Sequence, residues 1–235
     1  MQILGLAMLG FVVWFGFRDR GVAQVSPFDV HALIMVTVGS AAAVVVSSST
    51  STALRTIACL REILPGFRVF GRQTKAMEEE RAQLCAAWGE GKKSRALEIG
   101  EKSTYSASKK MVELLLSRSP QEASSKVFLE LRHDEIGRWQ PAINNWEMLS
   151  KLGPSFGMVG TITGMIQLFR NMSAENLNIG ASMSLALLAT LYGVAFGAGV
   201  AGPIGHYLNG LLDERLGFLE RCEKSVNELV SRVVV

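Results

Sequence analysis

Two stretches in the C-terminal half of the chain decide its fold: LGPSFGMVGTITGMIQLF at residues 152–169 and NLNIGASMSLALLATLYGVAFGAGVAGPIGHYLNGLL at residues 176–212. Neither stretch contains Asp, Glu, Lys or Arg. A helix of about 20 apolar residues crosses a bilayer core about 30 Å thick. Each stretch therefore predicts a transmembrane helix. The second helix, predicted at residues 177–212, is long enough to continue beyond the lipid.

Two further apolar stretches, residues 1–17 and 30–49, lie near the N-terminus and are separated by the short loop 18–29. Hydrophobic residues make up 49% of the 235 residues and charged residues only 19%, a composition typical of membrane proteins. The first stretch lacks the basic start and small-residue cleavage site of a signal peptide, so we expect it to be retained. The sequence therefore predicts an all-α polytopic membrane protein with four transmembrane helices.

The distribution of basic residues predicts the orientation of these helices. Of the 24 Lys and Arg residues, 21 lie in residues 50–151 or after residue 212, whereas Arg18, Arg20 and Arg170 lie in the two opposite loops. Basic residues near membrane spans favour the cytoplasmic side. Both termini, the segment 50–151 and the tail 213–235 are therefore predicted to be cytoplasmic. The loops 18–29 and 170–176 are predicted to lie outside.

The segment 50–151 is predicted to be a helical domain. Apolar residues recur at spacings of three and four, among charged ones, over residues 75–88, 95–118 and 121–140, which predicts amphipathic helices. Turn residues predict breaks at Pro65-Gly66, at residues 89–91 and at Ser119-Pro120.

Several function classes are excluded by composition. The net charge of +3 is too small and too dispersed for nucleic-acid binding. The three cysteines, Cys59, Cys85 and Cys222, have neither disulfide nor metal-site spacing and are predicted to be packing thiols. The histidines are scattered and no nucleophile or phosphate-binding motif occurs, so we expect no enzyme activity, no metal site and no cofactor.

The four predicted spans contain no Asp or Glu, the usual ion carriers inside membranes. They are instead rich in small residues, which allow helices to approach closely. The predicted helix-packing residues are Gly157, Gly160 and Gly164 on the third span and Gly193 and Gly197 on the fourth, continued at spacings of four by Ala201 and Gly205. By themselves, such stripes predict only helix packing or oligomerisation.

Two threonines and two prolines stand out on the same spans. The hydroxyls of Thr161 and Thr190 each allow two interpretations, since they either bond back to their own helix or supply oxygen ligands along an ion path. Pro154 suits the first turn of a helix. Pro203 lies inside the long fourth helix, where the missing backbone donor predicts a kink or a loosened turn.

The threonines and prolines lie in three sequence motifs: PSFGMVGTITG at 154–164, ATLYG at 189–193 and GPI at 202–204. These motifs resemble those of the MotA and PomA family of flagellar stator proteins. Shorter strings follow in family order, with FDV at 28–30, ALE at 96–98, RH at 132–133 and IG at 179–180. The resemblance covers essentially the whole chain and is strongest over residues 152–208.

The resemblance implies a bacterial inner-membrane complex in which five copies of this chain surround two copies of a MotB/PomB-like protein with one membrane span. That partner would supply the ion-binding aspartate that this chain lacks. Ion flow would then rotate the homopentamer, embedded in lipid, around the partner dimer. The loops 18–29 and 170–176 would be periplasmic.

The resemblance also implies roles for individual residues. Thr161 and Thr190 match ion-pathway positions, and Pro154 and Pro203 match prolines that couple ion passage to movement. Glu98 matches an acidic residue that contacts the rotor protein of the flagellar C-ring. Glu90 stands where the family usually has a basic residue, so Lys92, Lys93 and Arg95 are predicted to supply the basic part of the rotor contact.

Three functions remain open from sequence: a flagellar stator, the same motor core with another client as in ExbB and TolQ or in gliding or defence systems, and a scaffold that conducts nothing. The transported ion is either Na⁺ or H⁺. Sodium needs several oxygen ligands, so the two hydroxyls favour sodium.

Overall fold

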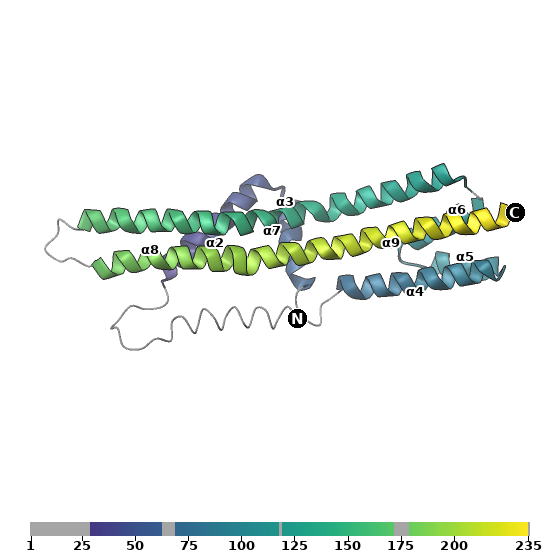
Figure 1. Ribbon diagram of the computed structural model, residues 1–235, viewed down its shortest axis with the longest axis horizontal. Coiled ribbons are helices and arrows are strands. Elements are labelled where there is room, and N and C mark those ends of the chain that lie inside the picture. Colours follow the sequence, from purple (N-terminus) through teal and green to yellow (C-terminus); the bar gives the residue numbers. More distant parts are fainter. Residues whose placement is uncertain (1–28, 63–68, 118, 172–178, 235) are drawn as a thin grey trace. The chain divides into compact units, whose positions relative to one another are not determined.

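The computed structural model describes residues 29–62, 69–117, 119–171 and 179–234, and the regular structure in these ranges is helical (Figure 1). The helices are α2 Val30–Ser47, α3 Thr50–Ala58, α4 Val69–Gly89, α5 Lys93–Lys102, α6 Ser106–Ser117, α7 Gln121–Asn171, α8 Ile179–Val194 and α9 Gly202–Val234, with a short 3₁₀ helix η1 Cys59–Glu62 and a π-helix η2 Ala195–Ala201. The all-α prediction is confirmed. The predicted first span and the Pro65-Gly66 break lie outside the described residues.

The chain divides into two compact units. Unit 1 contains the described residues up to 62 together with 142–171 and 179–207, and unit 2 contains residues 69–117, 119–141 and 208–234. Unit 2 is shorter at both ends than the segment 50–151 predicted as a domain, because α3 and residues 142–151 of α7 pack in unit 1.

In unit 1, α2 packs against α8 through one face. The buried residues Ala32, Val36, Ser40 and Val44 follow one another at spacings of four. Asp29 caps the helix, since its Oδ1 accepts the N–H of His31 at 2.9 Å and that of Ala32 at 3.3 Å. The helix predicted to end at residue 49 ends at Ser47, because the next two residues have extended backbones.

Helices α2, α7 and α8 also expose large apolar side chains. They include Val38 and Val46 on α2, Ile162 and Phe169 on α7 and Leu187 on α8. Within the described residues, two helical stretches have the length and hydropathy of a membrane span, Val30–Ser47 and Met183–Ser231. The predicted third span is not among them. Its glycines and hydroxyl residues lower its hydropathy.

Unit 2 has a hydrophobic core contributed by α4, α5, α6 and parts of α7 and α9. Its most deeply buried large side chains are Leu84, Met111, Leu115, Phe128, Phe218 and Val226. The predicted helices at 75–88 and 121–140 are confirmed as parts of α4 and α7. The breaks predicted near Gly91, whose φ is 76°, and at Ser119-Pro120 are confirmed too.

The single helix predicted at residues 95–118 is wrong, because α5 and α6 are separate helices. Ser103 interrupts the helix by accepting the N–H of Tyr105 at 3.0 Å, and it donates to the Glu80 carboxylate at 2.9 Å. The hydroxyl of Ser108 donates to the same Glu80 oxygen at 2.8 Å. Such local side-chain bonds compete with helical ones.

The cysteines occupy packing positions. Cys59 and Cys222 are buried and Cys85 is half-buried. Burial raises the pKa of the Cys222 thiol to about 12, so this side chain remains a neutral thiol at physiological pH.

The contact between α5 and α6 depends on Gly100. A Cβ at this position would lie 2.7 Å from Cγ2 and 3.0 Å from Cβ of Val112. We expect Gly100→Ala to lower the free energy of unfolding by about 1–3 kcal/mol through overpacking. Gly137→Ala is the matched control, since no atom lies within 4 Å of its added Cβ. It should raise the free energy of unfolding by up to about 1 kcal/mol through helix propensity.

Thermal unfolding of the detergent-solubilised chain, followed by circular dichroism, measures both changes. Equal stabilisation by the two alanines would show that α5 and α6 do not meet at Gly100.

Candidate ion pathway between α7 and α8

The third and fourth predicted spans pack closely through their glycines, and Figure 1 shows α7 and α8 running side by side. A Cβ built on Gly193 would lie 2.6 Å from the carbonyl oxygen of Gly153, and one on Gly157 would lie 3.0 Å from that of Ala189. One on Gly160 would lie 2.3 Å from the Ala189 Cβ. Larger residues here would force the backbones apart. Contacts that advance along α7 recede along α8, so the helices are antiparallel.

This approach brings Thr161 of α7 and Thr190 of α8 together, and their hydroxyls are hydrogen-bonded to each other. Two carbonyl oxygens complete the group. The Thr161 Oγ1 lies 3.1 Å from the Gly157 oxygen and 3.2 Å from that of Ala186, and the Thr190 Oγ1 lies 3.3 Å from the latter. We call these four oxygens the threonine cluster.

The threonine cluster has more contacts than protons. Four oxygen–oxygen contacts share two hydroxyl protons, so at any moment two contacts have no proton between them. Each hydroxyl contacts a carbonyl of its own helix, as the first interpretation predicts, and the two hydroxyls also meet across the interface. The role of these oxygens on an ion path stays a prediction. Gly164 is also buried on α7. Thr163 instead donates to the Val159 oxygen at 2.9 Å.

The cluster carries no formal charge. Residues 30–47, 152–169 and 179–212 contain no Asp or Glu, and the described part of the chain holds no group of three or more His, Cys, Asp or Glu suited to a metal ion.

A π-helix follows the threonine cluster along the chain. From Ala195 to Ala201 the chain forms a π-helix, whose backbone hydrogen bonds join residues five apart instead of four, and the N–H of Gly202 bonds to the oxygen of Gly197. Pro203, which has no N–H, follows directly. The loosening predicted at Pro203 therefore lies in the preceding turn. Such π-segments are frequent at functional sites.

Pro154 and Ser150 of α7 contact this π-helix. A Cβ on Gly197 would lie 2.5 Å from the Pro154 Cδ and 2.6 Å from the Ser150 oxygen, and one on Gly202 would lie 3.0 Å from the Ser150 Oγ. Sequence reasoning missed both the π-helix and Ser150. The glycine-rich string AFGAGVAGP at residues 195–203 was the available signal.

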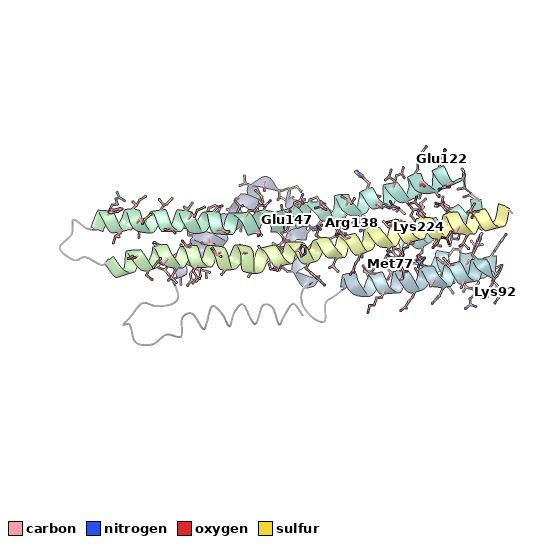
Figure 2. All side chains as sticks on the ribbon, in the orientation of Figure 1. Met77, Lys92, Glu122, Arg138, Glu147 and Lys224 are labelled. Carbon is pink, nitrogen blue, oxygen red and sulfur yellow. The ribbon has the colours of Figure 1, made fainter. Side chains whose placement is uncertain are left out.

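The predicted rotor residues lie together in unit 2, at the start of α5, and form the α5 charge patch of Lys92, Lys93, Arg95 and Glu98. Figure 2 shows Lys92 pointing away from the neighbouring helices. Its Nζ lies 2.7 Å from a carboxylate oxygen of Glu90, and the Lys93 Nζ lies 5.6 Å from the Trp88 ring centroid. The patch is exposed.

The acidic groups of this region are ionised at neutral pH. A hydrogen bond from Lys102, at 2.5 Å, lowers the pKa of Glu98, and the positive charge of Arg95 adds to the effect. A hydrogen bond from Lys92 lowers the pKa of Glu90 in the same way. The patch thus presents fixed charges of both signs.

Motility protein A of Aquifex aeolicus is 40% identical over 68 residues, which are 29% of this chain and 26% of that protein. Motility protein A of Cereibacter sphaeroides is 34% identical over 92 residues, which are 39% of this chain and 34% of that protein. The matched segments thus span only about a quarter to a third of these relatives.

Two solved structures share the fold. The structure of C. jejuni MotAB aligns with a TM-score of 0.75 at 15% identity, over 98% of this chain and 89% of that one. The flagellar MotAB stator complex of Bacillus subtilis aligns with a TM-score of 0.75 at 18% identity, over 97% and 88%.

The predicted resemblance is confirmed by a family match over residues 100–221, which include both threonines, both prolines and the packing glycines. Because this match covers more than half of the sequence, the chain belongs to the MotA/TolQ/ExbB proton channel family.

Proposed function

We propose that this chain is the ion-channel subunit of a flagellar motor stator, rotating as a homopentamer around a dimer of a MotB/PomB-like protein. The observation that carries the proposal is the threonine cluster, in which two hydroxyls meet on glycine-packed helices without any carboxylate. Such a site requires a partner that brings a negative charge. The C. jejuni and B. subtilis relatives of known structure are MotAB complexes, which supports a MotB-type partner.

The proposed topology has four spans in the bacterial inner membrane, with both termini, unit 2 and the tail in the cytoplasm. The exposed apolar faces of α2, α7 and α8 support it, as does the distribution of basic residues. The third span is the least hydropathic, but Met158, Ile162 and Ile166 give it an apolar outer face. The glycine face of this span is covered by α8, so the backbone polar groups on that face are not in contact with lipid.

Ion passage in this proposal uses the oxygens of the threonine cluster. The partner's carboxylate would hold the ion, while the Thr161 and Thr190 hydroxyls and the two carbonyl oxygens complete its coordination. Four closely spaced oxygens suit sodium, which must replace its lost water ligands. The family description names a proton channel, so proton transport along the two hydroxyls is the second candidate.

Coupling to rotation would use the π-helix and the two prolines. Thr190 lies just before Ala195, where the π-helix begins, and Pro154 packs against its middle at Gly197. A change in ion occupancy at Thr190 would thus act five residues before the turn that departs from α-helical hydrogen bonding. The α5 charge patch would contact the rotor of the C-ring. The family name also includes TolQ and ExbB, so another client for the same motor core is the alternative. We propose no catalytic activity and no cofactor.

The first test removes the Thr190 hydroxyl. We expect Thr190→Val, made with the MotB-like partner present, to reduce ion flux into vesicles about tenfold, since a lost hydrogen bond costs about 1.5 kcal/mol. Thr163→Val is the matched control, because that hydroxyl bonds only within α7. Equal flux in the two variants would remove the threonine cluster from the pathway. Imposed sodium and proton gradients, applied separately, identify the ion.

The second test restores a backbone donor after the π-helix. We expect Pro203→Ala to assemble normally but to lose most of its torque, because the new N–H tightens the turn that must adjust. Pro141→Ala is the control, since Pro141 lies in a regular part of α7. Tethered-bead rotation under load measures both. Undiminished torque in Pro203→Ala would separate this proline from coupling.

The third test reverses the charge of the α5 charge patch. We expect Lys92→Glu, Lys93→Glu and Arg95→Glu together to reduce recruitment of fluorescent stators to motors severalfold while leaving membrane insertion intact. Single reversals should have small effects, because exposed pairs are weak. Lys109, Lys126 and Lys224, changed together to Glu, give the same net charge elsewhere in unit 2. If both triple variants behave alike, the patch has no specific role.

A further inference from the structure

The face of α7 that carries Thr161 continues along the helix to Ser150. Eleven residues separate the two, which places their side chains about 20° apart around the helix and about 16 Å apart along it. Gly157 and Pro154 lie between them on this face, so Ser150 carries the next hydroxyl after the threonine cluster. In the proposed topology, Ser150 lies at the inner end of the third span.

Both oxygens of Ser150 lack their usual helical partners. The hydroxyls of Ser155 and Thr163, also on α7, donate to the carbonyls four residues before them, at 3.1 Å and 2.9 Å. Within the described ranges, the Ser150 hydroxyl makes no hydrogen bond. The Ser150 carbonyl would accept the N–H of residue 154 in an α-helix, but that residue is proline. The two oxygens are therefore available to a ligand.

The end of the π-helix brings a third oxygen to the same place. A Cβ on Gly202 would lie 3.0 Å from the Ser150 Oγ and 3.4 Å from the Gly197 carbonyl oxygen, so these two oxygens border the position that Gly202 leaves without a side chain. The Gly197 oxygen accepts the N–H of Gly202 and retains a second lone pair. The Ser150 carbonyl oxygen lies 2.6 Å from the position of a Cβ on Gly197.

Glu147 adds a carboxylate one helical turn further along. Its Cγ would lie 3.5 Å from a Cβ on Gly205, so Glu147 faces the turn of α9 that follows Gly202. The side chain is exposed, and among the described residues it makes no ion pair, although Lys151 lies four residues after it. Glu147, labelled in Figure 2, is the first acidic residue on α7 inward from the threonine cluster.

These groups have the chemistry of a cation site. Carboxylate, hydroxyl and carbonyl oxygens are the ligands of hard cations, and sodium needs several of them to replace the water that it loses. Conduction also requires more than one site of moderate affinity, because an ion held at a single tight site does not leave it. A second group of oxygens about 16 Å inward from the threonine cluster meets this requirement.

We propose that Glu147 and Ser150 form an exit site for sodium at the inner end of the ion path. The Glu147 carboxylate, the Ser150 hydroxyl and the carbonyl oxygens of Ser150 and Gly197 hold the ion after it leaves the threonine cluster. The ion there is partly hydrated, because Glu147 is open to solvent. The inference rests on the proposed function with sodium as the transported ion, but not on rotation.

A charge series at Glu147 tests the exit site in the full complex with the MotB-like partner, reconstituted into vesicles. Sodium flux is measured for each assembled complex. We expect Glu147→Asp to retain most of the flux, Glu147→Gln to reduce it about threefold and Glu147→Lys about tenfold, because a fixed charge raises or lowers the local concentration of cations. The same three changes at Glu130, an exposed acidic residue of unit 2, are the control and should leave the flux unchanged.

The Ser150 hydroxyl is tested by a variant that separates binding from stability. We expect Ser150→Ala to reduce sodium flux about threefold, since one ligand is lost. Its thermal unfolding temperature should not fall, because the hydroxyl makes no hydrogen bond within the described ranges. Ser155→Ala, which removes a hydroxyl that bonds within α7, should leave the flux unchanged.

Three outcomes overturn the exit site. Wild-type flux in Glu147→Lys and Ser150→Ala, with flux still reduced in Thr190→Val, would remove the exit site and leave the proposed pathway intact. An equal charge dependence at Glu130 would show a general effect of surface charge. Flux that is independent of sodium, or that is unchanged in all of these variants including Thr190→Val, would contradict the sodium pathway itself, and the exit site would fail with it.

Discussion

The close backbone approach of α7 and α8 is the constraint on which unit 1 depends. In the proposed membrane location, lipid offers no hydrophobic driving force between helices, so the association of α7 and α8 would rely on van der Waals contact over small residues. Gly153, Gly157 and Gly193 leave no room for a Cβ at the contact. The same approach lets the Thr161 and Thr190 hydroxyls meet. A larger residue on this face would separate the hydroxyl oxygens of Thr161 and Thr190 before it disturbed the rest of the fold.

The two units differ in the polar groups that their helices contain. Unit 2 pairs partly buried charges, since Arg132 bonds to Glu223, and Arg215 contacts Glu135 at 3.3 Å and the Gln73 side chain at 2.6 Å. The helices of unit 1 proposed to span the membrane have hydroxyls and carbonyls in place of charges. This division follows from the cost of charge in hydrocarbon. It is also why the proposed channel needs a carboxylate from a partner.

Sequence patterns predicted the helical fold, the helices at 75–88 and 121–140 and the placement of both threonines on the spans that carry the packing glycines. They failed where a side chain that is distant in sequence determines the backbone conformation. Helix 95–118 is divided at Ser103, whose hydroxyl bonds to Glu80 of another helix. The contact of Thr56 with Asn145 joins residues 89 positions apart, and no local periodicity records it. The family resemblance singled out the members of the α5 charge patch, and they lie together at the start of α5 because they are neighbours in sequence.

The π-helix explains why the small-residue stripe of the fourth span does not continue at spacings of four. Gly193 and Gly197 face α7, and in a regular α-helix Ala201 would be the next residue on that face. Gly202 instead contacts the Ser150 hydroxyl, because the π-turn places five residues where an α-turn places four. A Cβ on Gly202 would lie only 3.0 Å from the Ser150 Oγ, so the contact at this turn favours glycine. Pro203 supplies no N–H that would favour the α-turn.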